Sequence, residues 1–190
     1  PAGLKGARIA VASNTVIDYF VDMALQTAGF EASAAQKVEI NRIPLRFEML
    51  MSGGVEATGL PDPLALLAES GGGRTLTSNL ELGLSITGMV FTEQAMRAKA
   101  GLIKKMYLAY NRGVEYLAAH SPEDVRDILT QQMGFSPEQV HASTRLPLYR
   151  KAAPPPEEDL RAVLDWLAAR GLIRSGLEPD ALVNKAFLPE

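Results

Sequence analysis

Residues 8–30, Arg-Ile-Ala-Val-Ala-Ser-Asn-Thr-Val-Ile-Asp-Tyr-Phe-Val-Asp-Met-Ala-Leu-Gln-Thr-Ala-Gly-Phe, decide the fold that the sequence predicts. Ile9 to Ala12 is an unbroken apolar run, as in a strand that is covered on both faces of a parallel sheet. Ser13-Asn14-Thr15 supplies helix-capping side chains, and the helix that follows closes at Gly29, which suits a left-handed cap. The stretch therefore predicts a strand, a polar turn and a helix.

The polar turn has two interpretations. Ser, Asn and Thr are favoured capping residues, so the turn is explained by capping alone. A strand that leads into a helix N-terminus also leaves free backbone N–H groups at the carboxyl end of the strand, where α/β proteins bind ligands. In that case Ser13, Asn14 and Thr15 hold an anionic or polar group of a ligand. Both interpretations stay open.

The rest of the first half repeats this alternation. Residues 38–43, 55–60, 74–77 and 85–91 are further strand candidates, with short helices after Pro44 and Pro63. Strands that alternate with helices at this spacing predict an α/β fold with a mixed, mostly parallel sheet flanked by helices.

After Thr92 the strand signals disappear. A long helix is expected over 92–120, further helix starts at Ser121-Pro122 and Ser136-Pro137, and closing helices over 159–173 and 180–186. We therefore expect an α/β ligand-binding lobe over 1–92 and a helical C-terminal segment over 93–190.

Composition excludes several classes of protein. The net charge is −3 and the pI is near 5.5, which argues against nucleic-acid binding. The absence of Cys excludes disulfides, thiolate nucleophiles and Cys-based metal sites. No apolar run is long enough for a transmembrane helix. A chain that begins at Pro1 rather than Met is mature or shortened, which is compatible with a removed export signal.

Candidates for catalysis are few. His120 and His141 have neither a nucleophile nor a metal-ligand partner at a useful spacing, so we interpret both as surface or capping residues. Asp18 and Asp22 lie on one polar stripe of a helix, where solvation and the helix dipole explain them. Gly71-Gly72-Gly73 leads into a predicted strand and not into a helix, so it is a connector rather than a phosphate cradle. We expect no catalytic residue, metal or cofactor.

Three further side chains are candidates for ligand contact. Arg46 lies in the first turn of a predicted helix, where a positive charge is unfavourable; it is either an exposed arginine or one that faces a ligand or a salt bridge. Asp62 is either the N-cap of a helix that starts with Pro63 or part of a site at the end of the third strand. Tyr149 offers a stacking surface, whereas Trp166 is assigned to the helical core.

The ordered motifs resemble those of one family. They are Leu4-Lys5-Gly6-Ala7-Arg8-Ile9-Ala10-Val11 with the polar turn after it, Met51-Ser52-Gly53-Gly54-Val55-Glu56-Ala57, Leu60-Pro61-Asp62-Pro63, and the closing helices 159–173 and 180–188. In this order they resemble the solute-binding proteins of ABC importers with the type II periplasmic fold, in the group for alkanesulfonates, taurine, nitrate and thiamine precursors.

The resemblance implies a periplasmic or extracellular protein that binds a small polar or anionic solute between two lobes and delivers it to a membrane permease, without chemistry. The residues that face the ligand by this resemblance are Ser13, Asn14, Thr15, Asp62, Thr87 and Gly88. Arg46 and Tyr149 join them from the residue patterns alone.

The chain departs from the family in one respect. The family has another α/β lobe ahead of the Leu-Lys-Gly motif, and this chain begins at that motif. The resemblance therefore implies that half of the cleft is missing, and that the fragment exposes apolar surface and self-associates. Two alternatives stay open: an enzyme on the same fold, related to menaquinone-pathway or pyrimidine-forming proteins, and the effector-binding module of a transcription regulator.

Overall fold

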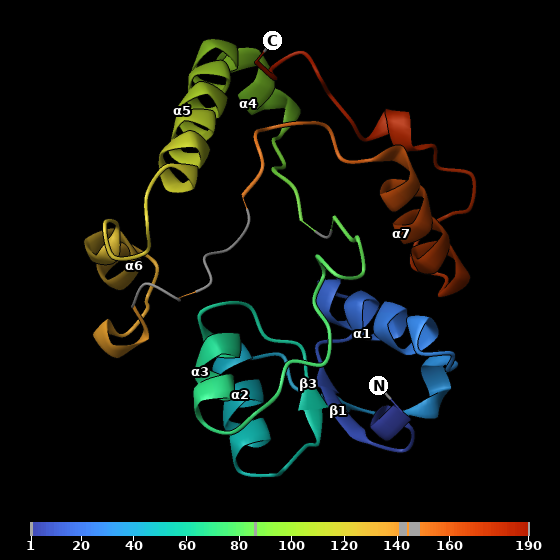
Figure 1. Ribbon diagram of the computed structural model, residues 1–190. Coiled ribbons are helices and arrows are strands. Elements are labelled where there is room, and N and C mark those ends of the chain that lie inside the picture. Colours follow the sequence, from blue (N-terminus) through green and yellow to red (C-terminus); the bar gives the residue numbers. More distant parts are fainter. Residues whose placement is uncertain (1, 86, 141–143, 145–148, 190) are drawn as a thin grey trace. The chain divides into compact units, whose positions relative to one another are not determined.

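The computed structural model describes residues 2–85, 87–140, 144 and 149–189 (Figure 1). The chain divides into two compact units. Unit 1 consists of Pro1–Thr87 and Glu158–Gly176, and unit 2 of Gly88–Glu157 and Leu177–Glu190. Each unit contains buried apolar residues of its own.

The sheet of unit 1 has three strands in the order β2-β1-β3. β1 (Arg8–Val11) pairs in parallel with β2 (Gln36–Glu39) on one side and with β3 (Ala57–Thr58) on the other. The predicted α/β character is confirmed. The predicted mixed sheet is not observed, because every described strand runs parallel to its neighbour.

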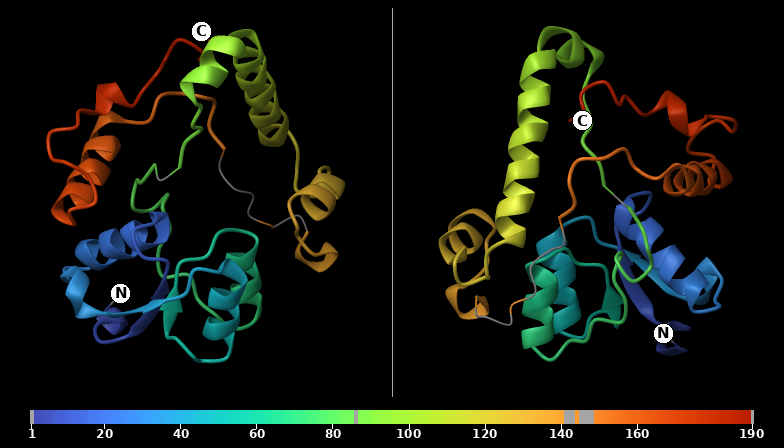
Figure 2. Two further views of the ribbon diagram at one scale, coloured as in Figure 1. Left: turned by 180° about the vertical axis from the view of Figure 1, so that it is seen from behind. Right: turned by 45° about the horizontal axis from the view of Figure 1, so that its top comes forward.

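Helices cover both faces of this sheet (Figures 1 and 2). Val11 of β1 packs on one face with Val21 and Leu25 of the first helix. Ala10 points to the other face, into the cluster that includes Met49. The alternation explains why the run in β1 is apolar throughout. The helices of unit 1 are α1 (Val16–Thr27), α2 (Ile43–Met51), α3 (Leu64–Ser70) and α7 (Glu157–Ala169), with 3₁₀ turns at Ala2–Leu4 and Ala32–Ala34.

The predicted start and end signals of the first helices are confirmed. The hydroxyl of Thr15, the N-cap of α1, accepts a hydrogen bond from the Ile17 N–H at 3.4 Å. Gly29 follows the helix with a φ of 80°, which a residue with a side chain rarely adopts. Pro44 lies in the first turn of α2, where its missing N–H has no cost.

The other predicted strands are shorter than expected or absent. Among the described residues, neither 74–77 nor 85–91 forms a strand. Between them the chain makes local turns, in which the Leu84 N–H donates to the Asn79 carbonyl at 2.8 Å. The predictions were wrong because a short apolar run becomes a strand only where a neighbouring strand accepts its hydrogen bonds.

Unit 2 is helical in its regular structure. Thr92 caps its first helix, as predicted, by accepting from the Ala95 N–H at 3.2 Å. The single helix predicted over 92–120 is interrupted at Lys99, whose φ of −130° and ψ of 26° are not helical. The helix predicted over 180–186 is only a 3₁₀ turn. The helical elements are α4 (Glu93–Ala98), α5 (Ala100–Ala118), α6 (Arg126–Gln132) and 3₁₀ turns at Pro137–Gln139 and Pro179–Ala181.

The described residues of unit 2 form a small core. Their buried apolar members are Ile103, Val125, Leu129, Phe135 and Val140. Within the part of the chain that the structure describes, no helix is both long and apolar enough to span a membrane.

Candidate functional site

The carboxyl edge of the sheet brings together several of the predicted residues. Because the three strands are parallel, their carboxyl ends meet at one edge. β1 leads there into Ser13, Asn14 and Thr15, and β3 leads through Gly59 toward Asp62. Binding sites of α/β proteins occur at this edge, so it is the candidate site of unit 1.

The turn after β1 is already occupied by an internal carboxylate. The backbone N–H and the hydroxyl of Ser13 both donate to the Glu39 carboxylate, the N–H at 3.1 and 3.2 Å from its two oxygens. The Asn14 N–H donates to Asp18, and the Thr15 hydroxyl donates to the Ala12 carbonyl at 2.6 Å. Glu39 therefore takes the place that the sequence prediction gave to a ligand anion.

Arg46 is not the exposed arginine that was one of the two expectations. It is 2% exposed and is the buried residue of α2. Its Nη1 donates to the carbonyls of Ile40 and Asn41, at 3.0 and 3.5 Å, just beyond β2. Its Nε is buried and has no acceptor, and burial lowers the pKa of its guanidinium. No carboxylate of the described residues forms an ion pair with it, so the expected salt bridge is also absent there.

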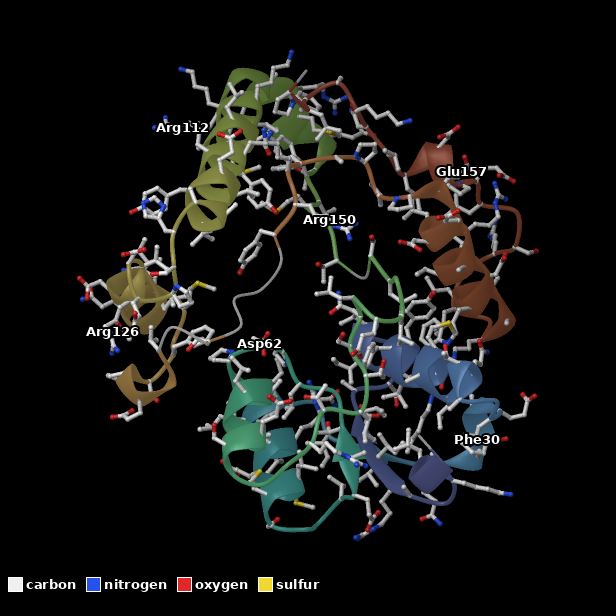
Figure 3. The ribbon with its side chains drawn as sticks, in the orientation of Figure 1. Phe30, Asp62, Arg112, Arg126, Arg150 and Glu157 are labelled. Atoms are coloured by element: carbon white, nitrogen blue, oxygen red, sulfur yellow. The ribbon has the colours of Figure 1, made fainter. Side chains whose placement is uncertain are left out.

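Asp62 does not cap α3. It lies in the connection between β3 and α3, exposed to solvent (Figure 3). The N-cap of α3 is Pro63, and no side chain caps that helix. The capping interpretation of Asp62 is therefore wrong, because the helix begins one residue later than expected.

The remaining predicted residues lie elsewhere along the chain. Thr87 is exposed at the end of the first segment of unit 1. Gly88 and Tyr149 belong to unit 2, where both are exposed. Within unit 1, the carboxyl edge gathers the residues that follow the strands, and the part of Gly88 and Tyr149 in a site stays a prediction.

Sequence reasoning missed a buried ionic cluster between α1 and α7. Asp18 and Asp22 were interpreted as a solvated stripe, but they are 1% and 2% exposed. The Lys37 Nζ lies 2.5 Å from an oxygen of each aspartate. The guanidinium of Arg170 pairs with the same two aspartates, at 2.8 and 2.6 Å. Two acids and two bases are therefore matched in this cluster.

An aromatic side chain completes the cluster. The indole N–H of Trp166 donates to Asp22 at 2.9 Å, and the Arg170 guanidinium lies 4.0 Å from the centre of the Trp166 ring. The ring also packs edge-on against Tyr19 at 5.5 Å between centroids. Trp166 was assigned to the helical core; it packs against a helix, which is α1 of unit 1, and is only partly buried there. The Arg170 Nη1 also reaches the Asn14 side chain at 3.3 Å, which ties the cluster to the turn after β1.

A sequence signal for this cluster existed. Asp18 and Asp22 are four residues apart on α1, and Trp166 and Arg170 are four residues apart at the end of α7. Residues at that spacing share one face of a helix. Two such faces of complementary chemistry favour helix-to-helix pairing, although nothing in the spacing says that these two helices are partners.

The pKa of Asp18 reflects the balance within the cluster. Burial alone raises it, but the hydrogen bonds from Lys37 and from the Asn14 N–H, with the charges of Lys37 and Arg170, bring the pKa below its ordinary value. Asp18 is therefore ionised at neutral pH.

Other places offer less chemistry. A hollow of about 720 Å³ is lined by α5 and the two residues after it, including Arg112 and Tyr116. Because a single helix lines this hollow, it cannot enclose a ligand.

The histidine that the structure describes has a structural role. His120 stacks on Tyr116 with 3.9 Å between ring centroids, and its Nδ1 lies 2.7 Å from the Tyr116 carbonyl oxygen. His141 lies outside the described residues. Within the described ranges, no three His, Cys, Asp or Glu side chains are grouped to hold a metal ion.

Comparison with known proteins identifies the fold. No family model matches the chain, and no curated protein matches it in sequence. Among solved structures it is similar to a protein described as the periplasmic sulfonate-binding protein SsuA of a sulfonate ABC transporter from Methylobacillus flagellatus KT. The TM-score is 0.67 and the sequence identity is 17%. The match covers 98% of this chain and 59% of that protein. At this identity the likeness shows the fold alone, which is that of a solute-binding protein.

Proposed function

We propose that this chain is part of the solute-binding component of an ABC importer, which captures a small polar or anionic solute and delivers it to a membrane permease. The observation that carries the proposal is the match of nearly the whole chain to a periplasmic sulfonate-binding protein. The resemblance of the ordered motifs, on which the sequence prediction rested, is to the same class of protein.

The finer parts of the proposal concern the place and the relatives of the protein. We place it in the periplasm or outside the cell, in the group that serves alkanesulfonates, taurine, nitrate and thiamine precursors, with the type II fold. Residues 1–92 act as the ligand-binding lobe and 93–190 as the helical segment. The neighbour is longer than this chain, which is compatible with a further lobe. It lends no support to self-association, and the proposal does not need it.

The proposed ligand-facing residues are those of the sequence prediction. Capture occurs between two lobes that close by a hinge motion. Because Glu39 holds the Ser13 donors, a solute that binds the turn exchanges places with that carboxylate. The residues are Ser13, Asn14, Thr15, Arg46, Asp62, Thr87, Gly88 and Tyr149.

A thermal-shift screen on the full-length protein tests the proposal. The panel contains sulfonates, nitrate, pyrimidines and neutral polar solutes. A ligand at one hundred times its Kd stabilises the native state by about 2.7 kcal/mol, so the true solute raises the melting temperature in a concentration-dependent way. A panel that leaves the melting temperature unchanged speaks against solute capture.

Two serines of unit 1 provide a matched pair of variants. Ser13 lies at the carboxyl edge, whereas Ser33 is exposed in the 3₁₀ turn Ala32–Ala34, whose Ala34 carbonyl accepts from Gly6 just before β1. Ser13→Ala should reduce the solute-induced shift, and Ser33→Ala should preserve it. Equal solute-induced shifts in melting temperature for the two variants would show that the solute does not bind at this edge, although the protein still binds it.

A further inference from the structure

Arg46 presents an unexplained charge at the candidate site. A guanidinium carries several N–H donors and stays protonated in proteins. Here the residue is 2% exposed, yet only Nη1 has protein acceptors, and both are backbone carbonyls. The Nε–H points at no acceptor. A buried donor without a partner and a buried cation without an anion are both costly, so the arrangement calls for a reason.

Other cations of unit 1 differ from Arg46 because they have carboxylate partners. Lys37 and Arg170 each pair with Asp18 and Asp22, so the charges of that cluster are balanced and neither aspartate is available to Arg46. Arg8 pairs with Glu56 on the surface. Arg46 is thus the buried cation of the described part of unit 1 whose counter-charge the protein does not supply.

The position of this guanidinium is the carboxyl edge of the sheet. The Ile40 N–H donates to the Val11 carbonyl at 2.7 Å, which continues the β1–β2 pairing, and the Ile40 carbonyl accepts from Arg46. The arginine is therefore fixed at the end of the ladder by the residue that follows Glu39. An arginine on α2 could have extended into solvent at no cost, as Arg42 does before that helix.

We propose that Arg46 is the anchoring residue for an oxyanion of the bound solute, that is, a sulfonate, sulfate, phosphate or carboxylate group. This inference rests on the proposed function, because the oxyanion belongs to the captured solute. The planar guanidinium offers Nε–H and Nη–H groups side by side, which match two oxygens of such a group. Binding supplies both the missing acceptor for Nε and the missing negative charge. Because the Arg46 side chain is only 2% exposed, neighbouring protein groups must move before the anion can reach its guanidinium.

Three variants of the full-length protein separate this role from a structural one. Arg46→Lys keeps the charge and removes the paired donors, and Arg46→Gln removes both. Arg42→Gln is the control, because it removes the same charge from an exposed arginine that lies just before α2. Ethanesulfonate, phosphate and acetate are titrated by calorimetry at constant ionic strength, with ethanol as the neutral probe. The three anions show whether the site prefers a sulfonate, a phosphate or a carboxylate group.

The inference predicts that at least one anion binds the wild type and ethanol does not. Arg46→Lys should weaken that binding by at least about tenfold, the usual effect of losing a charge-assisted hydrogen bond. Arg46→Gln should abolish it, and Arg42→Gln should stay within about twofold, since exposed charges interact weakly. Equal affinities of Arg46→Lys and the wild type overturn the inference.

A second measurement does not depend on the folding of any variant. In the wild type, the side-chain Nε–H resonance of Arg46 should move on saturation with the anion, because that proton gains its acceptor. A resonance that stays in place while the anion binds overturns the inference. If neutral or cationic solutes bind and anions do not, solute capture stands and the role of Arg46 falls; if no solute of any class binds, both fall.

Discussion

Helices α1 and α5 are both amphipathic in sequence, but only one is buried. α1 has 12 residues, of which Asp18, Tyr19, Val21, Asp22 and Leu25 are buried. α5 has 19 residues, and Ile103 is the buried one. The difference lies in the partners: α1 packs between β1 and α7, whereas most of α5 faces outward in the part of unit 2 that the structure describes. An apolar stripe therefore predicts a helix and not its degree of burial.

The charged residues of the two regions differ in the same way. The aspartates of α1 form ion pairs whose acid side chains are 1% and 3% exposed. Glu115 of α5 pairs with Lys151 at 2.5 Å, but those side chains are 58% and 61% exposed. Water screens the exposed pair, whereas in the cluster an unmatched charge stays in a region of low polarity. Ion pairs of similar length should thus contribute very differently to stability.

The largest expected effect comes from breaking the buried cluster. Asp18→Asn leaves Lys37 and Arg170 with too few acids, and removing one partner of a buried pair costs about 3–5 kcal/mol. The free energy of unfolding of unit 1 can be followed in urea by the fluorescence of Trp166, the one tryptophan of the chain, which lies in the cluster.

The control for this variant is Glu115→Gln. It breaks an exposed pair of the same chemistry, so the loss should be no more than about 1 kcal/mol. Because Glu115 belongs to unit 2, this loss is measured by urea unfolding followed by circular dichroism. Losses of equal size in the two variants would show that burial does not distinguish these ion pairs.

The next effect tests the apolar side of the comparison. Leu25→Ala creates a cavity in the core of unit 1, where the side chain is fully buried, and should cost about 2–5 kcal/mol. Leu108→Ala on α5 removes a side chain that is 53% exposed and should change stability by about 0.5 kcal/mol or less. Urea unfolding followed by circular dichroism measures both. A large, concentration-dependent loss for Leu108→Ala would mean that another surface covers α5 in solution.

Local chemistry made the first unit predictable as far as its elements go. The apolar run of β1, the Thr15 cap, the left-handed Gly29 and Pro44 in the first turn of α2 all depend on neighbouring residues, and all were found where the sequence placed them. The strand predictions for 74–77 and 85–91 were wrong because a strand also needs a hydrogen-bonding partner that is distant in the sequence.

The candidate site was predictable only in part, for the same reason. The position of Ser13, Asn14 and Thr15 at a sheet edge follows from the strand–turn–helix order. Their contacts do not: the carboxylate that holds Ser13 comes from another strand, 26 residues along the chain. The contact between Asp22 and Arg170 joins residues 148 apart, and no local pattern specifies it. The burial of Arg46 likewise depends on the end of β2, which the sequence prediction extended too far.

The smallest effect is the pH dependence that Asp18 gives to the cluster. The pKa of Asp18 is lower in the folded protein than in the unfolded chain, where it lies near the ordinary value of about 3.9. Between the two values the unfolded state binds more protons, so stability rises with pH. The contribution is complete above the unfolded pKa and is lost as the pH falls through the folded one. The urea midpoint of unit 1 should therefore fall as the pH is lowered through and below the ordinary aspartate pKa of about 3.9, and Asp18→Asn should lack this component while Leu108→Ala keeps it. If the urea midpoint of Asp18→Asn depends on pH as strongly as that of the wild type, other carboxylates cause the acid sensitivity. The buried and the exposed ion pairs would then differ in packing and not in their response to pH.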